Sequence, residues 1–227
     1  MKRTVEPELL DELPPNDPRA IHSRRDLRRI NFFMGDVRIV EKMLRGYFLQ
    51  PPKRIVELGA GDGTFMLELA RRLSNRWRNL EVILVDRQNL VSPETKERFH
   101  QLGWRIETIF SDVFEWLSAC EPCDCMMANL FLHHFESEEL SDLLRLASAK
   151  SKVFLACEPR RSSLGIFGTK FLRLIGCNDV TRHDAAVSVR AGFSDQEISE
   201  IWPPREGWKI VERGSGLFSH SFAAARR

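Results

Sequence analysis

A glycine-rich run with acidic residues beside it is the part of the sequence best suited to chemistry. It reads VELGAGDGTF and places Gly59, Gly61 and Gly63 at alternate positions, with Glu57 before them and Asp62 among them. Glycine has no side chain, so its backbone can approach a ligand closely and can adopt conformations that other residues avoid. The run lies between an apolar segment and an amphipathic one, which indicates a cofactor-binding turn from strand to helix.

Two kinds of cofactor are compatible with such a turn. A dinucleotide-binding fold uses the spacing G-x-G-x-x-G, with a pyrophosphate at the helix N-terminus. Here the third glycine comes one residue early, in G-A-G-D-G, and Thr64 follows it. Asp62 would also place a carboxylate where a phosphate would bind, which is unfavourable. The loop therefore favours a cationic or zwitterionic ligand over a nicotinamide dinucleotide.

Apolar and amphipathic runs alternate along most of the chain and predict the elements that hold this loop. Five buried strands are expected, over residues 54–58, 80–86, 105–112, 123–130 and 152–159. The helices expected between them cover residues 64–73, 92–103, 113–117 and 137–148. Apolar strands separated by helices indicate a parallel sheet covered on both faces.

The two ends of the chain depart from this alternation. Residues 18–49 have helical spacing and predict two helices broken near Gly35. After the fifth strand, helices are expected over 168–176 and 194–202, and two strands over 208–216 and 217–225, joined by a short turn and hence antiparallel. The predicted fold class is α/β, a Rossmann-like seven-stranded sheet that is mostly parallel, with an antiparallel C-terminal strand pair and an N-terminal helical lid.

Acidic or amide side chains stand at the ends of three further strands. Asp86 ends the second strand, Asp112 and Val113 follow the third, and Asn129 ends the fourth. The carboxyl ends of parallel strands meet at one edge of the sheet, which is where ligands bind in open α/β folds. We therefore expect these residues to share one site with the glycine run.

This combination of motifs resembles the class I S-adenosylmethionine-dependent methyltransferases, whose first motif is written [DE]-x-G-x-G-x-G. The resemblance covers roughly residues 53 to 160 and implies S-adenosyl-L-methionine as the cofactor. In that family the acid after the second strand holds the ribose hydroxyls, and the residues after the third strand hold the adenine. The cofactor-binding residues implied here are Glu57, Gly59, Ala60, Gly61, Gly63, Asp86, Arg87, Asp112, Val113, Asn129 and Leu130.

The methyl acceptor is less well defined by the sequence. Asn129 is followed by Leu-Phe and not by the Pro-Pro-aromatic sequence of methyltransferases that act on adenine or glutamine nitrogens, which argues against amino-nitrogen acceptors. The candidate bases are His133, His134 and His183. His133 is the first candidate for acceptor positioning or proton removal and His183 the second, whereas a structural role for the histidine pair is the alternative interpretation.

The segment N-L-F-L-H-H-F resembles the ubiquinone-biosynthesis-type branch of small-molecule methyltransferases. Two other stretches, R-R-D-L-R-R-I-N-F-F-M-G and N-D-V-T-R-H-D-A-A-V-S-V-R-A-G-F, resemble bacterial methyltransferases that accompany type III polyketide synthases. That resemblance implies alkylated pyrones or phenols as acceptors. The predicted function is methyl transfer to an oxygen of a small hydrophobic acceptor. A C-methyltransferase on a quinone-like ring and a non-catalytic S-adenosylmethionine-binding protein are the alternatives.

Composition narrows the remaining classes. The chain has 227 residues and a net charge of +2, which gives no broad reason to expect nucleic acid as a partner. The sequence has no apolar run of about 18 residues, so no membrane span is predicted and the protein is expected to be cytoplasmic. The cysteines lack the paired spacing of a zinc site, so no metal is expected. The expected organisation is a loosely ordered stretch over 1–18, a helical lid over 19–50 and a methyltransferase domain over 51–227.

Overall fold

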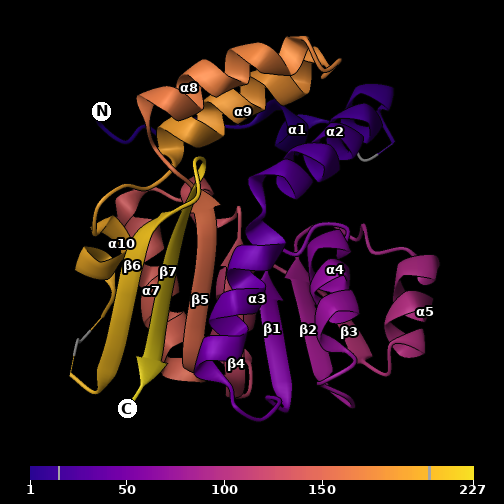
Figure 1. Cartoon of the computed structure of the whole chain (residues 1–227), viewed down its shortest axis with the longest axis vertical. Coiled ribbons are helices and arrows are strands. Elements are labelled where there is room, and N and C mark those ends of the chain that lie inside the picture. The colour runs from indigo at the N-terminus through magenta and orange to yellow at the C-terminus, as the bar shows by residue number, and fades with distance from the viewer. Residues whose placement is uncertain (15, 204–205) are drawn as a thin grey trace.

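A seven-stranded β-sheet forms the centre of the protein. The computed structural model describes residues 1–14, 16–203 and 206–227. The strands are β1 (Arg54–Leu58), β2 (Glu81–Asp86), β3 (Arg105–Phe110), β4 (Cys123–Asn129), β5 (Ser151–Pro159), β6 (Trp208–Ser215) and β7 (Ser219–Arg226). Their order across the sheet is β3-β2-β1-β4-β5-β7-β6, and β7 runs in the opposite direction to the other strands (Figure 1).

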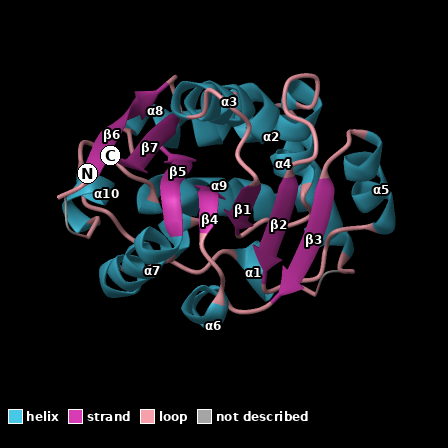
Figure 2. Ribbon diagram, turned by 90° about the horizontal axis from the view of Figure 1, so that it is seen from below, coloured by secondary structure: helices cyan, strands magenta, loops and turns pink. Residues whose placement is uncertain are grey.

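Helices surround the sheet on its two faces and at one edge. They are α1 (Leu9–Glu12), α2 (Pro18–Met34), α3 (Asp36–Tyr47), α4 (Thr64–Leu73), α5 (Pro93–Gln101), α6 (Val113–Ala119), α7 (Ser137–Lys150), α8 (Ser163–Thr169), α9 (Asp179–Ala191) and α10 (Glu197–Ile201), with the 3₁₀ helices η1 (Leu132–His134) and η2 (Lys170–Arg173). Figure 2 shows α3, α4 and α5 on one face of the sheet and α6, α7 and α10 on the other.

Each face of the sheet has its own hydrophobic core, because side chains alternate along every strand. Along β1, Ile55 packs toward α3 and α4, whereas Val56 and Leu58 pack toward α6 and α7. Burying an aliphatic side chain of this size contributes about 1.5–3 kcal/mol. Glu57 therefore points to the same face as Ile55, into the layer of α3 and α4, although it is charged in water.

A further group of helices lies across the carboxyl ends of the parallel strands. Figure 1 shows α1, α2, α8 and α9 above that edge of the sheet, and α9 contacts α1, α2 and α8. Gly35 separates α2 from α3 by adopting φ +78°, a left-handed conformation that ends one helix and lets the next leave in a new direction. As a result α2 lies over the edge, while α3 packs on the sheet against β5 and β7.

The predicted fold is confirmed in its sheet, its antiparallel C-terminal pair and the break at Gly35. The expected strand over 54–58 and helix over 64–73 match β1 and α4 residue for residue. The structure differs most from the prediction between the fifth strand and the last helix, because α9 is a helix that the sequence does not predict. The stretch 1–18 is expected to be loosely ordered, but Leu9–Glu12 within it form α1 and residues before and within α1 make specific contacts described below; Pro15 lies outside the described residues.

Candidate active site

The glycine loop after β1 has a close approach at Gly59 and an open position at Gly61. Gly59 and Gly61 have φ values of +69° and +55°, which side-chain-bearing residues rarely adopt. A Cβ placed on Gly59 would lie 2.1 Å from Cδ2 of Phe131, the residue that follows β4 by two positions. A Cβ on Gly61 would have no atom within 4 Å. The loop thus packs against Phe131 at Gly59 and leaves its backbone uncovered at Gly61.

Backbone and carboxylate contacts fix the loop against β2. The amides of Gly59 and Ala60 donate to the carbonyl of Val85 at 2.9 and 3.1 Å. One carboxylate oxygen of Asp86 accepts from the amide of Gly61 at 2.8 Å. Asp86 therefore lies at the mouth of the loop, as the sequence predicts. Its other oxygen accepts from the amide of Gln88 at 2.8 Å. A carboxylate has about four acceptor positions, so these two contacts leave capacity for a ligand.

Three acidic side chains, those of Glu57, Asp62 and Asp86, lie close together around the loop. Glu57 is only 1% exposed, and burial raises its pKa well above its ordinary value, with Asp86 and Asp62 raising it further. Asp62 forms an ion pair with Arg28 of α2 at 2.9 Å. The ion pair ties the helix over the edge to the glycine loop and places a cation beside these acids.

Three buried oxygen atoms near the carboxyl ends of the central strands lack a hydrogen-bond partner among the described residues. They are Oε2 of Glu57, Oδ1 of Asn129 and Oδ2 of Asp36. A buried acceptor without a partner costs about 1–3 kcal/mol, so native proteins rarely keep one without a reason. Acceptors of this kind suit a ligand that carries N–H or O–H donors or positive charge.

Asp36, the first residue of α3, joins this group from outside the sheet. Its Oδ1 accepts from Ser219 Oγ at 2.5 Å and from Cys157 Sγ at 3.5 Å. Cys157 is the register partner of Asn129, which places Asp36 beside the end of β4. Burial raises the pKa of Asp36 to about 6, against the two hydrogen bonds, which lower it. Sequence reasoning missed Asp36 because it lies in a segment expected to act only as a lid.

The turn after β4 is strained. Leu130 has φ +52°, which is uncommon for a branched side chain, and its amide donates to the Cys157 carbonyl at 2.9 Å. Strained backbone of this kind is concentrated at functional sites, where surrounding contacts hold it in place. Asn129 and Leu130, both predicted as site residues, thus lie at a turn whose geometry the neighbouring strand imposes.

Asp112 and Val113 lie at the start of α6. The Asp112 carboxylate accepts from the amides of Phe114 and Glu115 at 2.8 and 3.4 Å, which makes it the N-cap of that helix. Val113 is buried against the core on the α6 and α7 face. Arg87, also predicted, is paired with Asp11 at 3.1 Å and is largely exposed.

His133 is buried between two carboxylates. Its Nδ1 lies 2.8 Å from Oε2 of Glu158, and its Nε2 lies 3.4 Å from Oε1 of Glu8. Although burial alone would lower the pKa of His133, the hydrogen bonds and charges of Glu158 and Glu8 raise it to about 9. In this arrangement the ring is an imidazolium at neutral pH, with both nitrogens occupied. It can position other groups, but it has no free nitrogen to accept a proton.

His183 lies on α9, apart from His133 and His134. It is half exposed, and its Nδ1 is 3.0 Å from Oδ1 of the adjacent Asp184. Asp184 is buried and accepts from the amides of Leu9 and Leu10 at 2.8 and 3.0 Å. Asp184 thus serves mainly to hold the start of α1, and His183 remains on the outer side of that contact.

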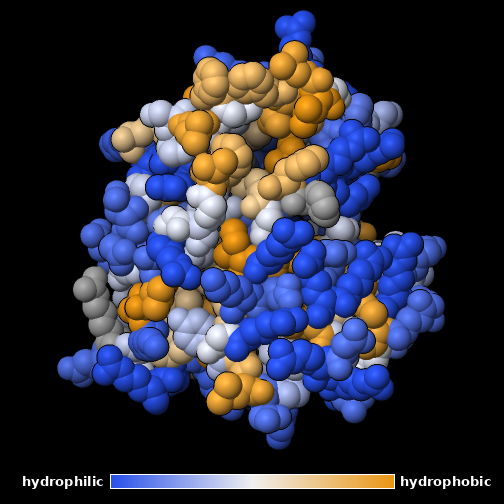
Figure 3. All heavy atoms as spheres, in the orientation of Figure 1, coloured by the Kyte–Doolittle hydropathy of each residue, from blue (hydrophilic) through white to orange (hydrophobic). Residues whose placement is uncertain are grey.

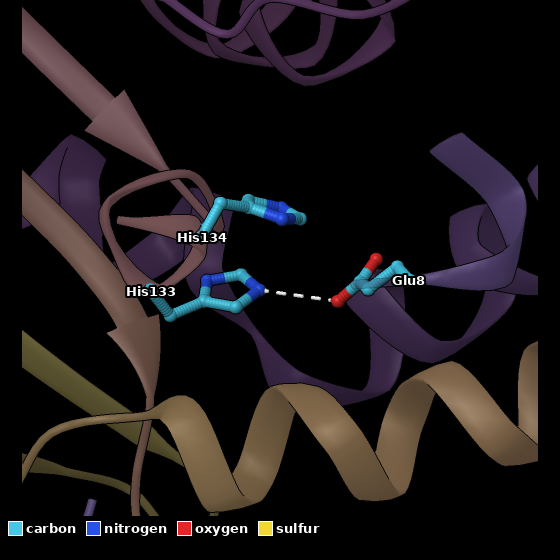
Figure 4. A group of neighbouring side chains, drawn as sticks. All are labelled: Glu8, His133 and His134. Atoms are coloured by element: carbon cyan, nitrogen blue, oxygen red, sulfur yellow. Dashed lines mark hydrogen bonds and ion pairs between the residues drawn. The ribbon is translucent and has the colours of Figure 1, made fainter. Parts of the chain in front are cut away.

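Residues 1–12, the N-terminal segment, cross the loop that follows β4. Arg3 donates to the carbonyls of His133 and Phe135 at 3.2 and 2.8 Å. Glu8 contacts His133 and the hydroxyl of Ser188. Figure 4 shows Glu8 facing both His133 and His134. The segment therefore covers the histidine pair, and sequence reasoning missed it because these partners are more than 100 residues apart in the chain.

The chain is similar to known proteins in sequence and in fold. Residues 55–151 match a protein family described as a methyltransferase domain. A curated relative, the carboxy-S-adenosyl-L-methionine synthase of Nautilia profundicola, is 25% identical over 132 residues, which cover 58% of this chain and 54% of that protein. The chain thus spans about half the length of the curated relative it matches.

Solved structures extend the likeness over nearly the whole chain. The plantazolicin methyltransferase BpumL, in complex with a triazolic desmethylPZN analog and SAH, is similar with a TM-score of 0.69 and 14% identity over 93% of this chain and 92% of that one. Magnesium protoporphyrin IX methyltransferase from Synechocystis PCC 6803, with bound SAH, has a TM-score of 0.57 and 15% identity, with 86% and 83% covered. At these identities the likeness establishes the fold.

One further feature concerns membranes. Within the described part of the chain, no helix is both long and apolar enough to cross a bilayer.

Proposed function

We propose that the protein transfers the methyl group of S-adenosyl-L-methionine to a small, rather hydrophobic acceptor. The match of residues 55–151 to a methyltransferase domain and the likeness of the fold to solved methyltransferases support this proposal. The observation that carries this proposal is the pair of unpartnered oxygens on Glu57 and Asn129, near the ends of β1 and β4, together with the open glycine loop that follows β1. Acceptors of this kind suit a ligand that carries a sulfonium and an ammonium group.

The cofactor would lie across the carboxyl ends of β2, β1 and β4. Asp86 would accept from the ribose hydroxyls, and Asp112 with the amide of Val113 would hold the adenine. Glu57 and Asn129 would face the methionine part. Burial is the main cause of the raised pKa of Glu57, with Asp86 and Asp62 adding to it, and a positively charged ligand would favour the ionised carboxylate. The exposed backbone at Gly61 would let the cofactor approach without a steric clash.

The acceptor would bind between the edge of the sheet and the helices above it. Those helices, together with η2 and the turn that follows it, carry exposed large hydrophobic residues, among them Phe33, Phe167, Phe171 and Leu174. Figure 3 shows hydrophobic residues gathered over the upper part of the molecule, where α8 and α9 lie. Small-molecule sites are mostly apolar with a few placed polar groups, which favours an acceptor with a hydrocarbon part and one reactive polar atom.

We propose oxygen as the methylated atom, in a phenol or a pyrone. Methyl transfer is an in-line displacement from sulfonium, so the protein must position the nucleophile and remove any proton on it. With its nitrogens on Glu8 and Glu158, His133 would position the acceptor side of the site, and His183 stays the candidate for proton removal. An acceptor with an acidic hydroxyl, such as a hydroxypyrone, would arrive already ionised.

The experiment is a product assay with a binding control. The protein is incubated with S-adenosylmethionine and a panel of alkylated pyrones and phenols, and S-adenosylhomocysteine formation and the mass of each product are followed. Asp86→Ala should weaken cofactor affinity by about 1.5–3 kcal/mol, the range for hydrogen bonds to a charged group, and should lower turnover.

Three results separate the alternatives. An O-methyl signal in the product supports the proposal, and a C-methyl signal supports the alternative of a quinone-type C-methyltransferase. Cofactor binding without turnover on any acceptor would indicate a binding protein. Turnover that survives unchanged in Asp86→Ala would remove Asp86 from the site.

A further inference from the structure

Glu8, His133 and His134 form a compact group of potential metal ligands outside the glycine loop. Each offers one ligand atom, and these atoms all lie within 4.8 Å of one another. Glu8 comes from the N-terminal segment, and the two histidines come from η1 directly after β4. Figure 4 shows the carboxylate of Glu8 facing the imidazoles, with the two rings lying one above the other.

The spacing of these atoms is close to that of a tetrahedral metal site. In such a site, with bonds of about 2.1 Å, neighbouring ligand atoms are about 3.4 Å apart. The distance between His133 Nε2 and Glu8 Oε1 is 3.4 Å. The rings of His133 and His134 have their centroids 4.3 Å apart and are tilted by 32°, and the ligand atom of His134 lies within 4.8 Å of the other two.

The surroundings of His133 are those of a metal-ligating histidine. Its Nδ1 is held at 2.8 Å by Glu158, so that Nε2 points toward Glu8. Glu158 is itself fully buried and fixed by the amides of Phe131 and Leu132 at 3.1 and 3.0 Å. Metal-binding histidines usually donate their second nitrogen to a carboxylate in this way, which fixes the ring and makes it a better ligand.

We propose that Glu8, His133 and His134 bind a divalent cation of the zinc class. Two imidazole nitrogens and one carboxylate suit Zn²⁺ and its neighbours in the transition series. The imidazolium of His133 would lose its Nε2 proton to solvent when the cation binds, because only the neutral ring is a ligand, so binding should release a proton. Three protein ligands leave one position for water or a further oxygen, and the carboxylate of Asp11 lies 3.8 Å from Nδ1 of His134. The sequence predicts no such site, because Glu8 and His133 are 125 residues apart.

A cation at this position would link two distant parts of the chain. It would join the N-terminal segment to the loop after β4, and that loop begins at the end of the strand that carries Asn129. Binding would therefore fasten the segment across the acceptor side of the site. Cation binding should protect the segment from proteolysis as well as stabilise the fold.

Zn²⁺ is the probe for the test. Tag-free protein is stripped with a chelator and titrated with Zn²⁺ by calorimetry, without cofactor or acceptor, so that the result is independent of methyl transfer. We expect one Zn²⁺ per chain, with an affinity at least tenfold weaker in Glu8→Gln and in His134→Ala. His100→Ala is the matched control, because His100 is exposed on α5 and far from the group in sequence; it should bind as the wild type does.

A second readout separates a lost ligand from a damaged fold. Thermal melts without metal show whether each variant is folded, and tryptic cleavage of the N-terminal segment is compared with and without Zn²⁺. Protection by Zn²⁺ in the wild type, and its loss in folded His134→Ala, supports the proposal. Wild-type affinity no higher than that of the two ligand variants, or an equal loss in His100→Ala, would overturn it.

Discussion

Replacing Asp36 with asparagine should change how stability depends on pH. Asp36 is completely buried, and burial raises its pKa to about 6 from the ordinary value of 3.8. Its Oδ1 keeps Ser219 and Cys157 as partners, and these contacts can be made equally by an asparagine oxygen. The substitution therefore removes the ionisation and leaves the shape and the hydrogen bonds largely in place.

The magnitude follows from the difference in pKa. Below pH 3.8 the carboxyl is protonated in both the folded and the unfolded protein, so it adds no pH dependence. Between pH 3.8 and 6 the folded protein holds a proton that the unfolded chain has lost, so the free energy of unfolding falls as pH rises. At pH 7 the free energy of unfolding has fallen by ~3 kcal/mol, because the two pKa values differ by about 2 and each pKa unit corresponds to about 1.36 kcal/mol.

The assay is urea unfolding of the cofactor-free protein at several pH values between 4 and 7.5. Asp36→Asn should gain stability relative to the wild type as pH rises, by about 3 kcal/mol over this range. Glu121→Gln, at an exposed residue before β4, is the control and should follow the wild type. If the two curves for wild type and Asp36→Asn stay parallel, Asp36 is not a buried acid of raised pKa, and the reasoning fails.

Two other predictions concern the loop and the N-terminal segment. Gly59→Ala should lower the free energy of unfolding by about 2–4 kcal/mol, because its Cβ would meet Phe131 and its φ is positive. Gly61→Ala should lower it by only about 1–2 kcal/mol, because only the backbone conformation is unfavourable there. Equal losses would mean that the Phe131 ring moves aside freely. Asp184→Ala should speed tryptic cleavage of the N-terminal segment at least about tenfold, because two charge-assisted hydrogen bonds are lost. His183→Ala should leave that rate near the wild-type value, and a similar acceleration in both variants would contradict the assignment.

The sequence predicts the sheet and the helices on its faces well, for a local reason. Strands buried on both faces appear as short apolar runs, and β1 stands out because glycines end it abruptly. The polar residues at the ends of β2 and β4 were found by the same rule, since parallel strands bring their carboxyl ends together. Helix α9 was missed because its sequence is largely polar at the start and its apolar face is short.

The histidine environment could not be predicted, because its parts come from distant segments. Glu8, Glu158 and His133 meet only once the sheet has formed and the N-terminal segment lies across its edge. One feature of the sequence points to this environment. Glu158 is an acidic residue near the end of an apolar strand, in the same kind of position as Asp86 at the end of another strand. Nothing local distinguishes Glu8 from the other acids near the start of the chain, or Asp36 from an ordinary first-turn acid.

The central claim is tested most directly by the binding of S-adenosylmethionine, S-adenosylhomocysteine and NAD to the wild-type protein at matched concentrations. A ligand at a hundred times its dissociation constant adds about 2.7 kcal/mol of stability, which for a domain of this size raises the melting temperature by roughly 5–11 °C. The account predicts this shift with the two sulfur-containing ligands and none with NAD. A shift with NAD alone would contradict it.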